Sequence, residues 1–364
     1  MGLGAAAVAA WPLLRRDAVG ALLAAPPVFP GQVGDAIAYT TATGTPCWRF
    51  FAFAGAPADD FHYVQCIVPQ SLDVAVPTPT VLVTHGATGT EASIIGEINP
   101  RTGVRKALPY VVDSWLDHGW PVVAGRQGST ITDTGRGRNG QWGSQASRLG
   151  IVDSWHWVQT AWTPHPNGFC VFGMSMGGAV ALNFLLEAKT QAIPVAGAYS
   201  LDGVTNLAYC YTKNFSFAKQ IRTVYGIVSP CVPGDEQWIA KVNVPDGGHD
   251  PQACSPSQFA PVPIRLAASG NDPSVHRIAN SLLFFNTMTA SGWPVEFSQL
   301  AYTGGHTAAK HFRPTDINPF FERALAIAPW PPITTTTEAP TTTAAPPPPT
   351  EAPTTTTEAP IPPI

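Results

Sequence analysis

Residues 168–178 read Gly-Phe-Cys-Val-Phe-Gly-Met-Ser-Met-Gly-Gly and lead into an apolar run, Ala-Val-Ala-Leu-Asn-Phe-Leu-Leu. This pattern predicts a short buried strand, a glycine-rich turn and an apolar helix. A sharp turn from strand to helix strains the backbone of its central residue, here Ser175, and side chains two positions away would collide with neighbouring backbone. Glycine at positions 173 and 177 removes those collisions. The stretch therefore predicts that Ser175 projects from the carboxyl edge of a sheet.

A serine held in a Gly-x-Ser-x-Gly turn between a strand and a helix is typical of a nucleophile. The amide of Met176 would lie at the start of the helix, where backbone N–H groups point at developing negative charge. A Gly-Ser turn that enters a helix also occurs for tight packing alone. The chemical interpretation therefore depends on a base and an acid elsewhere in the chain.

Strand and helix patterns alternate through most of the sequence. Apolar runs predict strands at 80–86, 121–125, 168–174, 193–200, 262–268 and 295–302, and helical spacing predicts helices at 108–118, 147–162, 274–289 and 315–327. Three aromatic and β-branched runs, at 36–40, 48–53 and 62–68, predict antiparallel strands at one edge. We therefore expect an α/β fold: a doubly wound, mostly parallel sheet flanked by helices.

Composition divides the chain of 364 residues into three parts. Residues 1–34 form an apolar and then proline-rich N-terminal segment, and residues 35–330 form the α/β domain. Within that domain, residues 203–260 are irregular in pattern and predict a cap inserted over the site. Residues 331–364 repeat Thr-Thr-Thr-Thr-Glu-Ala-Pro and carry too little apolar surface to fold, which predicts a disordered tail.

Charge and spacing exclude several classes of function. The formal net charge is −4, and three of the acidic residues lie in the tail, so the remainder is nearly neutral. Because no basic stripe could neutralise phosphates, we expect no nucleic-acid partner. The sequence has neither the Cys and His spacing of a metal site nor a glycine-rich dinucleotide or phosphate loop. We therefore expect no cofactor and no metal.

Six cysteines occur, and Cys170, inside the strand before Ser175, is expected to be a small buried apolar residue. Proximity along the chain suggests Cys47 with Cys66, and Cys231 with Cys254, as pairs that could form disulfides. Together with the apolar N-terminus, this favours a secreted protein, and the Thr/Pro-rich tail suggests display on a cell envelope or a phage virion. A cytoplasmic location stays open.

A serine hydroxyl needs a base, and the base needs an orienting acid. In a parallel sheet both come from loops at the carboxyl ends of later strands. Strand 262–268 leads into Gly-Asn-Asp-Pro-Ser-Val, which places Asp272 at one loop tip, and strand 295–302 leads into Gly-Gly-His, which places His306 at the next. We expect both side chains to lie beside Ser175.

With the serine turn and these two loops in the order Ser, Asp, His, the chain resembles the α/β-hydrolase superfamily over residues 78–328. The resemblance implies that Ser175 is the nucleophile, His306 the general base and acid, and Asp272 its orienter. His85-Gly86-Ala87 is similar to the oxyanion turn of that superfamily. The amide of Ala87 would then join that of Met176 in holding an oxyanion.

Other residues compete for these roles. His249 follows a second Gly-Gly pair and is an alternative base, while Asp202 ends strand 193–200 and is an alternative acid. His311 is expected to be a packing or surface residue, and His85 to brace its turn. Trp142 and Arg126, with His85 and Gly86, are candidates for the wall of a substrate pocket.

The function favoured by these patterns is that of a serine ester hydrolase that works through an acyl-enzyme. Its substrate would be a small-molecule, lipid or polymer ester, with a cell-envelope surface as a further contact. The same residues serve serine peptidases and thioesterases. A binding protein built on a hydrolase scaffold and displayed on a surface or virion is the alternative from another class.

Overall fold

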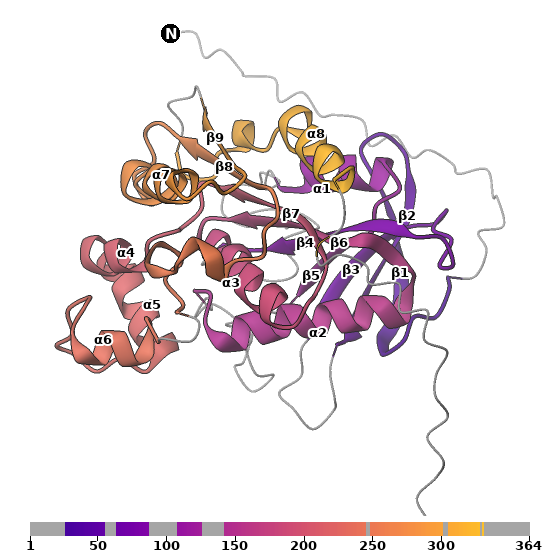
Figure 1. The fold of residues 1–364 in the computed structure, drawn as a ribbon. Coiled ribbons are helices and arrows are strands. Elements are labelled where there is room, and N and C mark those ends of the chain that lie inside the picture. The colour runs from indigo at the N-terminus through magenta and orange to yellow at the C-terminus, as the bar shows by residue number, and fades with distance from the viewer. Residues whose placement is uncertain are drawn as a thin grey trace, which may run out of the picture. The chain divides into compact units, whose positions relative to one another are not determined.

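The computed structural model describes residues 26–54, 63–86, 108–125, 142–244, 248–300, 305–327 and 330 (Figure 1). The chain divides into two compact units, residues 1–332 and 333–364. Every element described below belongs to the first unit. The predicted disordered tail and most of the predicted N-terminal segment lie outside the described residues.

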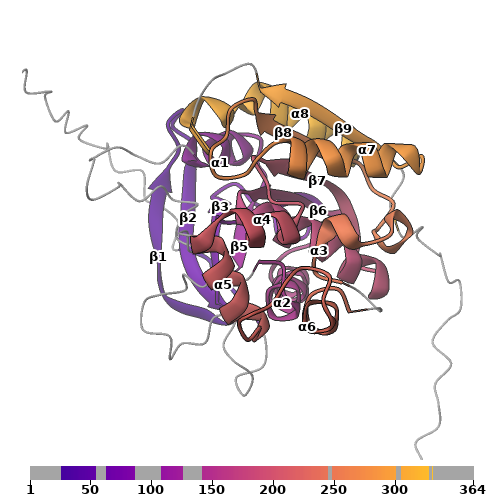
Figure 2. The same cartoon turned by 90° about the vertical axis from the view of Figure 1, so that its left-hand side faces the viewer.

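A nine-stranded sheet organises the described part of the first unit, in the order β1-β2-β3-β5-β4-β6-β7-β8-β9. The strands from β4 to β9 pair in parallel, whereas β1, β2 and β3 continue from β5 as an antiparallel edge (Figure 2). This confirms the mostly parallel sheet and its antiparallel edge. The bounds are β1 Gln32–Thr40, β2 Pro46–Phe53, β3 Tyr63–Pro69, β4 Thr78–Thr84, β5 Val122–Gly125, β6 Pro164–Met174, β7 Val195–Leu201, β8 Ile264–Ser269 and β9 Val295–Leu300.

Helices cover both faces of this sheet. Helices α1 and α8 pack together on one face, and α2, α3 and α7 pack on the other (Figure 1). The bounds are α1 Leu108–Asp117, α2 Gln145–Ala161, α3 Met176–Thr190, α7 Leu283–Ala290 and α8 Pro314–Leu325. The helix predicted at 274–289 begins as a π-helical turn over Ile278–Leu282 and becomes regular only from Leu283.

The sequence of β6 shows why its apolar residues run on without alternation. Phe169 and Val171 join the core under α2 and α3, while Cys170 and Phe172 join the core under α1 and α8. Successive side chains of a strand point to opposite faces, so a strand covered on both sides must be apolar throughout. Both faces of β6 are thus covered by helices. Ser175 directly follows Met174, the last residue of the strand.

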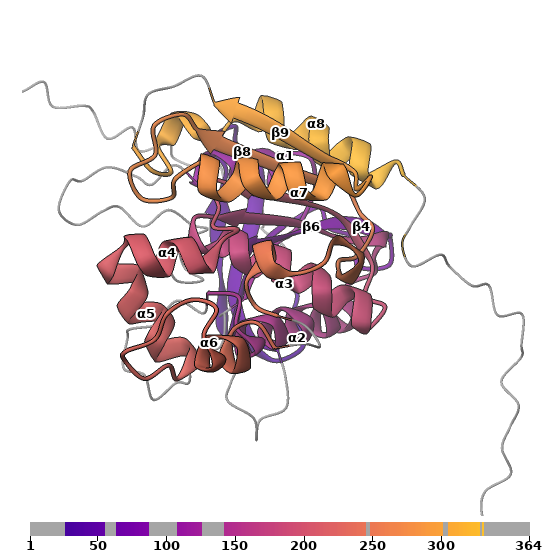
Figure 3. The ribbon, with the colours of Figure 1, turned by 60° about the vertical axis from the view of Figure 1, so that its left-hand side comes forward.

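The inserted segment 203–260 is more regular than its sequence pattern predicts. It contains three short helices, α4 Leu207–Lys213, α5 Phe215–Tyr225 and α6 Glu236–Lys241, which lie together in Figure 3. Elements of 6 to 11 residues carry too few turns for an apolar period to stand out. Side chains that cap each helix (Asn206, Asn214 and Asp235) are the signal that could have revealed them, because each accepts the backbone N–H three residues on.

All six cysteines are free thiols, so neither suggested disulfide forms. Cys47 pairs opposite Pro69, and Cys66 opposite Phe50, in the antiparallel ladder of β2 and β3. That register sends the two thiols to opposite faces of the sheet, Cys47 into one core and Cys66 into the other. A disulfide needs Cβ atoms about 4 Å apart and pointing together, which this arrangement forbids. Cys170 is fully buried in the apolar core.

Among the helices that the structure describes, none combines the length and apolar character required to cross a bilayer.

Candidate active site

The turn between β6 and α3 holds Ser175 in a strained backbone conformation, with φ 55° and ψ −127°. A Cβ atom on Gly173 would lie 2.4 Å from the carbonyl oxygen of Gly177, and one on Gly177 would lie 2.2 Å from the carbonyl oxygen of Thr84. Both positions therefore require glycine. A non-glycine residue at positive φ costs on the order of 1–3 kcal/mol and marks a site where surrounding structure enforces the geometry.

Ser175, His306 and Asp272 form a hydrogen-bonded chain. The Nε2 atom of His306 lies 2.6 Å from Oγ of Ser175, and its Nδ1 lies 2.6 Å from Oδ2 of Asp272. A carboxylate only accepts, so Nδ1 carries the proton and Nε2 of the neutral ring accepts the serine proton. The side chain of His306 keeps 19% of its surface exposed, while that of Asp272 keeps 1%. The arrangement is one that can make the hydroxyl of Ser175 nucleophilic.

Asp272 is fixed by its own loop after β8. Its Oδ1 accepts the backbone N–H groups of Ser274 at 2.7 Å and Val275 at 2.9 Å, while its Oδ2 faces His306. The Gly-Asn-Asp-Pro-Ser-Val turn thus uses one carboxylate oxygen to shape itself and presents the other to the imidazole. Charge-assisted bonds of this kind are short and strong.

The alternative acid, Asp202, has other partners. Its Oδ1 accepts the N–H of Ser269 at 2.7 Å, and its Oδ2 accepts the N–H of Thr307 at 3.0 Å and Nδ1 of His311 at 2.7 Å. The side chains of Asp202 and His311 are both fully buried. His311 is therefore a buried hydrogen-bonding residue and not a surface one. The pairing joins positions 109 residues apart, and no local pattern in the sequence signals it.

The alternative base, His249, lies in the inserted segment. Its ring is packed 5.4 Å from the ring of Tyr225, and its carbonyl oxygen accepts Nδ2 of Asn183 at 2.6 Å. Burial lowers the pKa of His249 to about 4, and the nearby Arg148 guanidinium acts in the same direction. A ring that stays neutral and packs inside the cap is a structural one.

Of the two residues predicted to hold an oxyanion, the structure describes Met176 and not Ala87. The amide of Met176 is the first of α3 and so has no helical carbonyl to bond. The turn His85-Gly86 abuts the serine, because a Cβ on Gly86 would lie 3.2 Å from that of Ser175. His85 is buried, with Nδ1 2.9 Å from the carbonyl oxygen of Gly86, as a bracing residue would be. Ala87 lies outside the described residues.

Trp142 was expected to line a substrate pocket, but the structure buries it. Its side chain is fully buried, its indole N–H donates to Oε1 of Gln220 at 3.2 Å, and its ring packs edge-on against Phe217 of α5. Tyr225 donates its hydroxyl to the carbonyl oxygen of Trp142 at 2.8 Å. Trp142 therefore anchors the inserted helices to the core. Arg126, the other candidate from this loop, lies outside the described residues.

Asp202, Asp272 and His306 also deserve consideration as metal ligands, because one ligand atom from each lies within 4.8 Å of the others. Hydrogen bonds already account for their positions. Both carboxylates bind backbone N–H groups, and the imidazole bridges Asp272 and Ser175. We therefore interpret this cluster as a hydrogen-bonded network.

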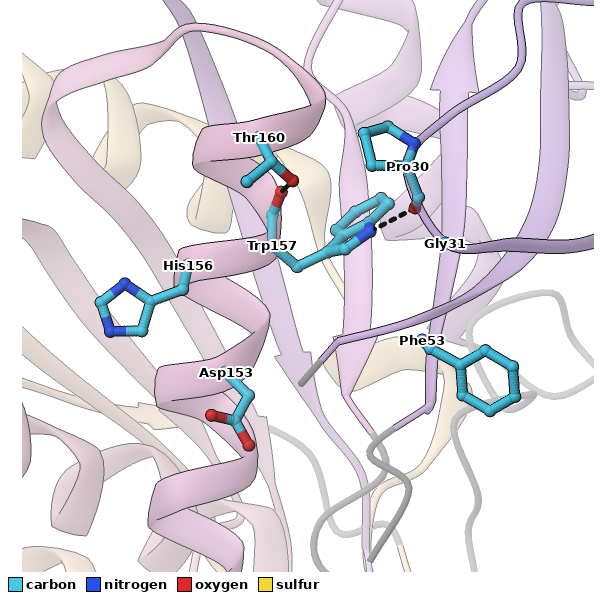
Figure 4. A pocket seen from close by; sticks show the side chains of 7 residues that line it. All are labelled: Pro30, Gly31, Phe53, Asp153, His156, Trp157 and Thr160. Carbon is cyan, nitrogen blue, oxygen red and sulfur yellow. Dashed lines mark hydrogen bonds between the residues drawn. The ribbon is translucent and has the colours of Figure 1, made fainter. Parts of the chain in front are cut away.

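A separate hollow of about 310 Å³ lies between α2 and the segment around Pro30. Figure 4 shows Trp157 donating its indole N–H to the carbonyl oxygen of Pro30 at 2.8 Å, with His156 and Asp153 further along the helix. None of the residues that line it belongs to the hydrogen-bonded chain at Ser175.

No family model matches the sequence, and no curated protein is similar to it. Solved structures are similar in fold. Acylaminoacyl peptidase of Pyrococcus horikoshii has a TM-score of 0.52 and 13% identity, over 80% of this chain and 41% of that chain. An acylaminoacyl peptidase in complex with Z-Gly-Gly-Phe-chloromethyl ketone has a TM-score of 0.56 and 15% identity, over 80% and 42%. S-formylglutathione hydrolase of Agrobacterium tumefaciens has a TM-score of 0.53 and 12% identity, over 79% and 98%.

The chain spans about two fifths of the length of the two peptidases. At such identities the comparison concerns the course of the backbone alone. We conclude that this chain has the fold of the α/β-hydrolase superfamily.

Proposed function

We propose that this chain is a serine hydrolase that cleaves carboxylic esters, with Ser175 as nucleophile, His306 as general base and acid, and Asp272 as orienting acid. One observation carries the proposal: a strained serine whose Oγ lies 2.6 Å from an imidazole that is itself held by a buried carboxylate. The proposal does not depend on a metal or an organic cofactor, since the residues supply a nucleophile, a base and an acid.

The chemistry follows from this geometry. His306 Nε2 takes the proton of Ser175 as Oγ bonds to the ester carbonyl carbon, and Asp272 stabilises the imidazolium that forms. The amide of Met176, the first of α3, holds the oxyanion, and from the sequence alone we assign the second donor to the amide of Ala87. The intermediate collapses to an acyl-enzyme as His306 gives its proton to the leaving alkoxide. His306 then deprotonates a water, whose attack releases the carboxylic acid and restores the hydroxyl of Ser175.

An apolar cluster of buried residues packs beside the site. Met176, which follows the nucleophile, and Val275, which donates to Asp272, belong to one apolar cluster with residues of α4, α5 and α6. The similar S-formylglutathione hydrolase is covered over 98% of its length, whereas the peptidases carry much additional chain. S-formylglutathione is a thioester, so this likeness favours esters and thioesters over peptides, and within that class we propose an ester of a small molecule, a lipid or a polymer.

The test uses a fluorophosphonate probe and a series of p-nitrophenyl esters of graded chain length. We expect covalent labelling at Ser175, turnover of the esters, and loss of both in Ser175→Ala with the fold retained. Ser147→Ala is the matched control, because Ser147 is another buried serine, bonded to the carbonyl oxygen of Ser144 within α2. That variant should keep wild-type turnover.

Three outcomes would redirect the proposal. Ester hydrolysis that persists in Ser175→Ala would contradict the role of Ser175. Labelling together with strict preference for acyl-amino-acid amides or thioesters would keep the mechanism and change the substrate class. Absence of both labelling and turnover in the intact chain would favour a binding protein with a hydrolase scaffold.

A further inference from the structure

A second His–Asp pair, His311 with Asp202, lies next to the pair formed by His306 and Asp272. Asp202 stands at the end of β7, between β6, which carries Ser175, and β8, which leads to Asp272. Its carboxylate accepts three hydrogen bonds at 2.7–3.0 Å and is fully buried. Its backbone has φ 45°, a conformation that side chains rarely adopt and that persists only where the structure enforces it.

The three donors come from the two loops that carry the acid and the base. Ser269, which donates to Oδ1, is the last residue of β8, three positions before Asp272. Thr307, which donates to Oδ2, directly follows His306. The carboxylate of Asp202 therefore links the start of the loop that carries Asp272 (the acid loop) to the loop that carries His306 (the base loop).

His311 supplies the third bond and closes the base loop at its other end. Its Nδ1 donates to the same Oδ2 atom of Asp202 that accepts Thr307, so the segment 307–311 is held at both ends. His311 ends the 3-10 turn Ala309–His311, just ahead of α8, and its side chain is fully buried. The segment that follows His306 is thereby fastened to the end of β7.

Resting on the proposed function, we propose that Asp202 and His311 are positioning residues that hold the imidazole of His306 in line between Ser175 and Asp272. They do not touch the substrate. The physical reason is reach: β9 lies three strands from β6, roughly 14 Å at the usual strand spacing, yet His306 bonds Ser175 at the end of β6. A buried carboxylate at the end of β7, between these strands, fixes the position of the base loop.

Asp202→Asn is the first test. An amide keeps the size of the side chain but places an NH₂ group against N–H donors, so at least one of the three bonds is lost. We expect kcat for the ester to fall on the order of 10- to 100-fold, with KM within about two-fold, because a misplacement of about 1 Å costs as much. A change confined to KM, or an unchanged kcat in the folded variant, would overturn the proposal.

Two variants at position 311 distinguish a specific effect on kcat from a general loss of stability. His311→Asn places an amide N–H close to the position of Nδ1, whereas His311→Phe keeps a ring and removes the donor. We expect His311→Asn to retain most of the wild-type kcat and His311→Phe to behave like Asp202→Asn. Equal kcat in the two folded variants would contradict a positioning role.

A readout that needs no turnover is the proton resonance of the Nδ1–H of His306, which we expect far downfield because this N–H bonds Asp272 at 2.6 Å. We expect Asp202→Asn and His311→Phe to shift or broaden it. Asp250→Asn is the matched control: Asp250 is another buried aspartate, but its carboxylate accepts the backbone N–H groups of Leu207 and Ala208 in the inserted segment and bonds neither of the loops that carry Asp272 and His306.

The control should leave the resonance in place. If the wild-type chain neither reacts with the fluorophosphonate probe nor hydrolyses esters, the proposed function fails. The Nδ1–H resonance of His306 still tests, in that case, whether Asp202 positions the imidazole. An identical resonance in wild type, Asp202→Asn and His311→Phe would overturn the inference.

Discussion

His306 and Ser175 are 131 residues apart in the chain, yet Nε2 of the one lies 2.6 Å from Oγ of the other. The sheet brings them together, because β6 and β9 run parallel and end at the same edge. Asp272 follows β8, which lies between them in space as in sequence. The contact therefore depends on the loops that cross this edge as much as on the strands.

Asp272→Asn should abolish most of the activity while it preserves the fold. The amide oxygen can still accept the N–H groups of Ser274 and Val275, but its NH₂ would face Nδ1 of His306. The imidazole then takes the other tautomer and directs an N–H at Ser175, which it can no longer deprotonate. We expect kcat to fall by about 10⁴-fold at constant KM, measured by steady-state ester hydrolysis. A loss below tenfold would exclude Asp272 as the orienting acid.

Gly177→Ala should destabilise the chain, because its methyl group would meet the carbonyl oxygens of Thr84 at 2.2 Å and His85 at 2.7 Å. Backbone atoms cannot move aside as a flexible side chain can. We expect the free energy of unfolding in urea to drop by about 3 kcal/mol, the upper end of the usual cost of overpacking. Gly248→Ala is the control, since its nearest neighbour is 3.5 Å away, and it should change stability by less than about 1 kcal/mol. Equal effects of the two variants would contradict the tight turn.

Asp250 should make the folded state less stable as the pH rises from about 4 to 6. Burial raises its pKa to about 6, although the N–H groups of Leu207 and Ala208 favour the charged form. The folded chain keeps a proton in this range that the unfolded chain has released. The free energy of unfolding thus falls by up to about 3 kcal/mol across the window. We expect Asp250→Asn to remove this contribution, as measured by urea unfolding at pH 4 and pH 7.

His249, the next residue along the chain, should act in the opposite direction. Its pKa is lowered to about 4 by burial, so between pH 4 and 6.5 the unfolded chain binds a proton that the folded chain refuses. Stability then rises with pH through that window, again by up to about 3 kcal/mol. Relative to wild type, Asp250→Asn should gain stability with rising pH and His249→Phe should lose it. Parallel pH curves for the two variants would show that neither group titrates as proposed.

The cysteines should react as six thiols. Five are buried and Cys231 is partly exposed, so a chromogenic thiol reagent should reach at most one thiol in the folded chain and six in denaturant. Because Cys47 and Cys66 point to opposite faces of the sheet, the Tm should be the same with and without a reducing agent. Fewer than six thiols in denaturant, restored by reduction, would contradict this arrangement.

Local signals in the sequence account for the strands and for the long helices. A continuous apolar run such as 168–174, bounded by glycines, predicts a strand buried on both faces, and the structure places it inside the sheet between β4 and β7. The helices of the inserted segment escaped prediction because they are short. The Asn and Asp residues at their N-termini were the available signal, and they indicate helix starts only when the residues after them are read as helical.

The chain by itself determined that Ser175 stands in a glycine-flanked turn and that Asp272 and His306 stand at loop tips, because turn chemistry and apolar periodicity act over a few residues. Only the tertiary structure decided which aspartate forms a hydrogen bond with which histidine. Asp202 and Asp272 both follow strands, and His306 and His311 are five positions apart, so local signals cannot separate the pairings. The sheet edge separates them: backbone N–H groups and His311 occupy the carboxylate of Asp202, which leaves Asp272 to bind the imidazole beside Ser175.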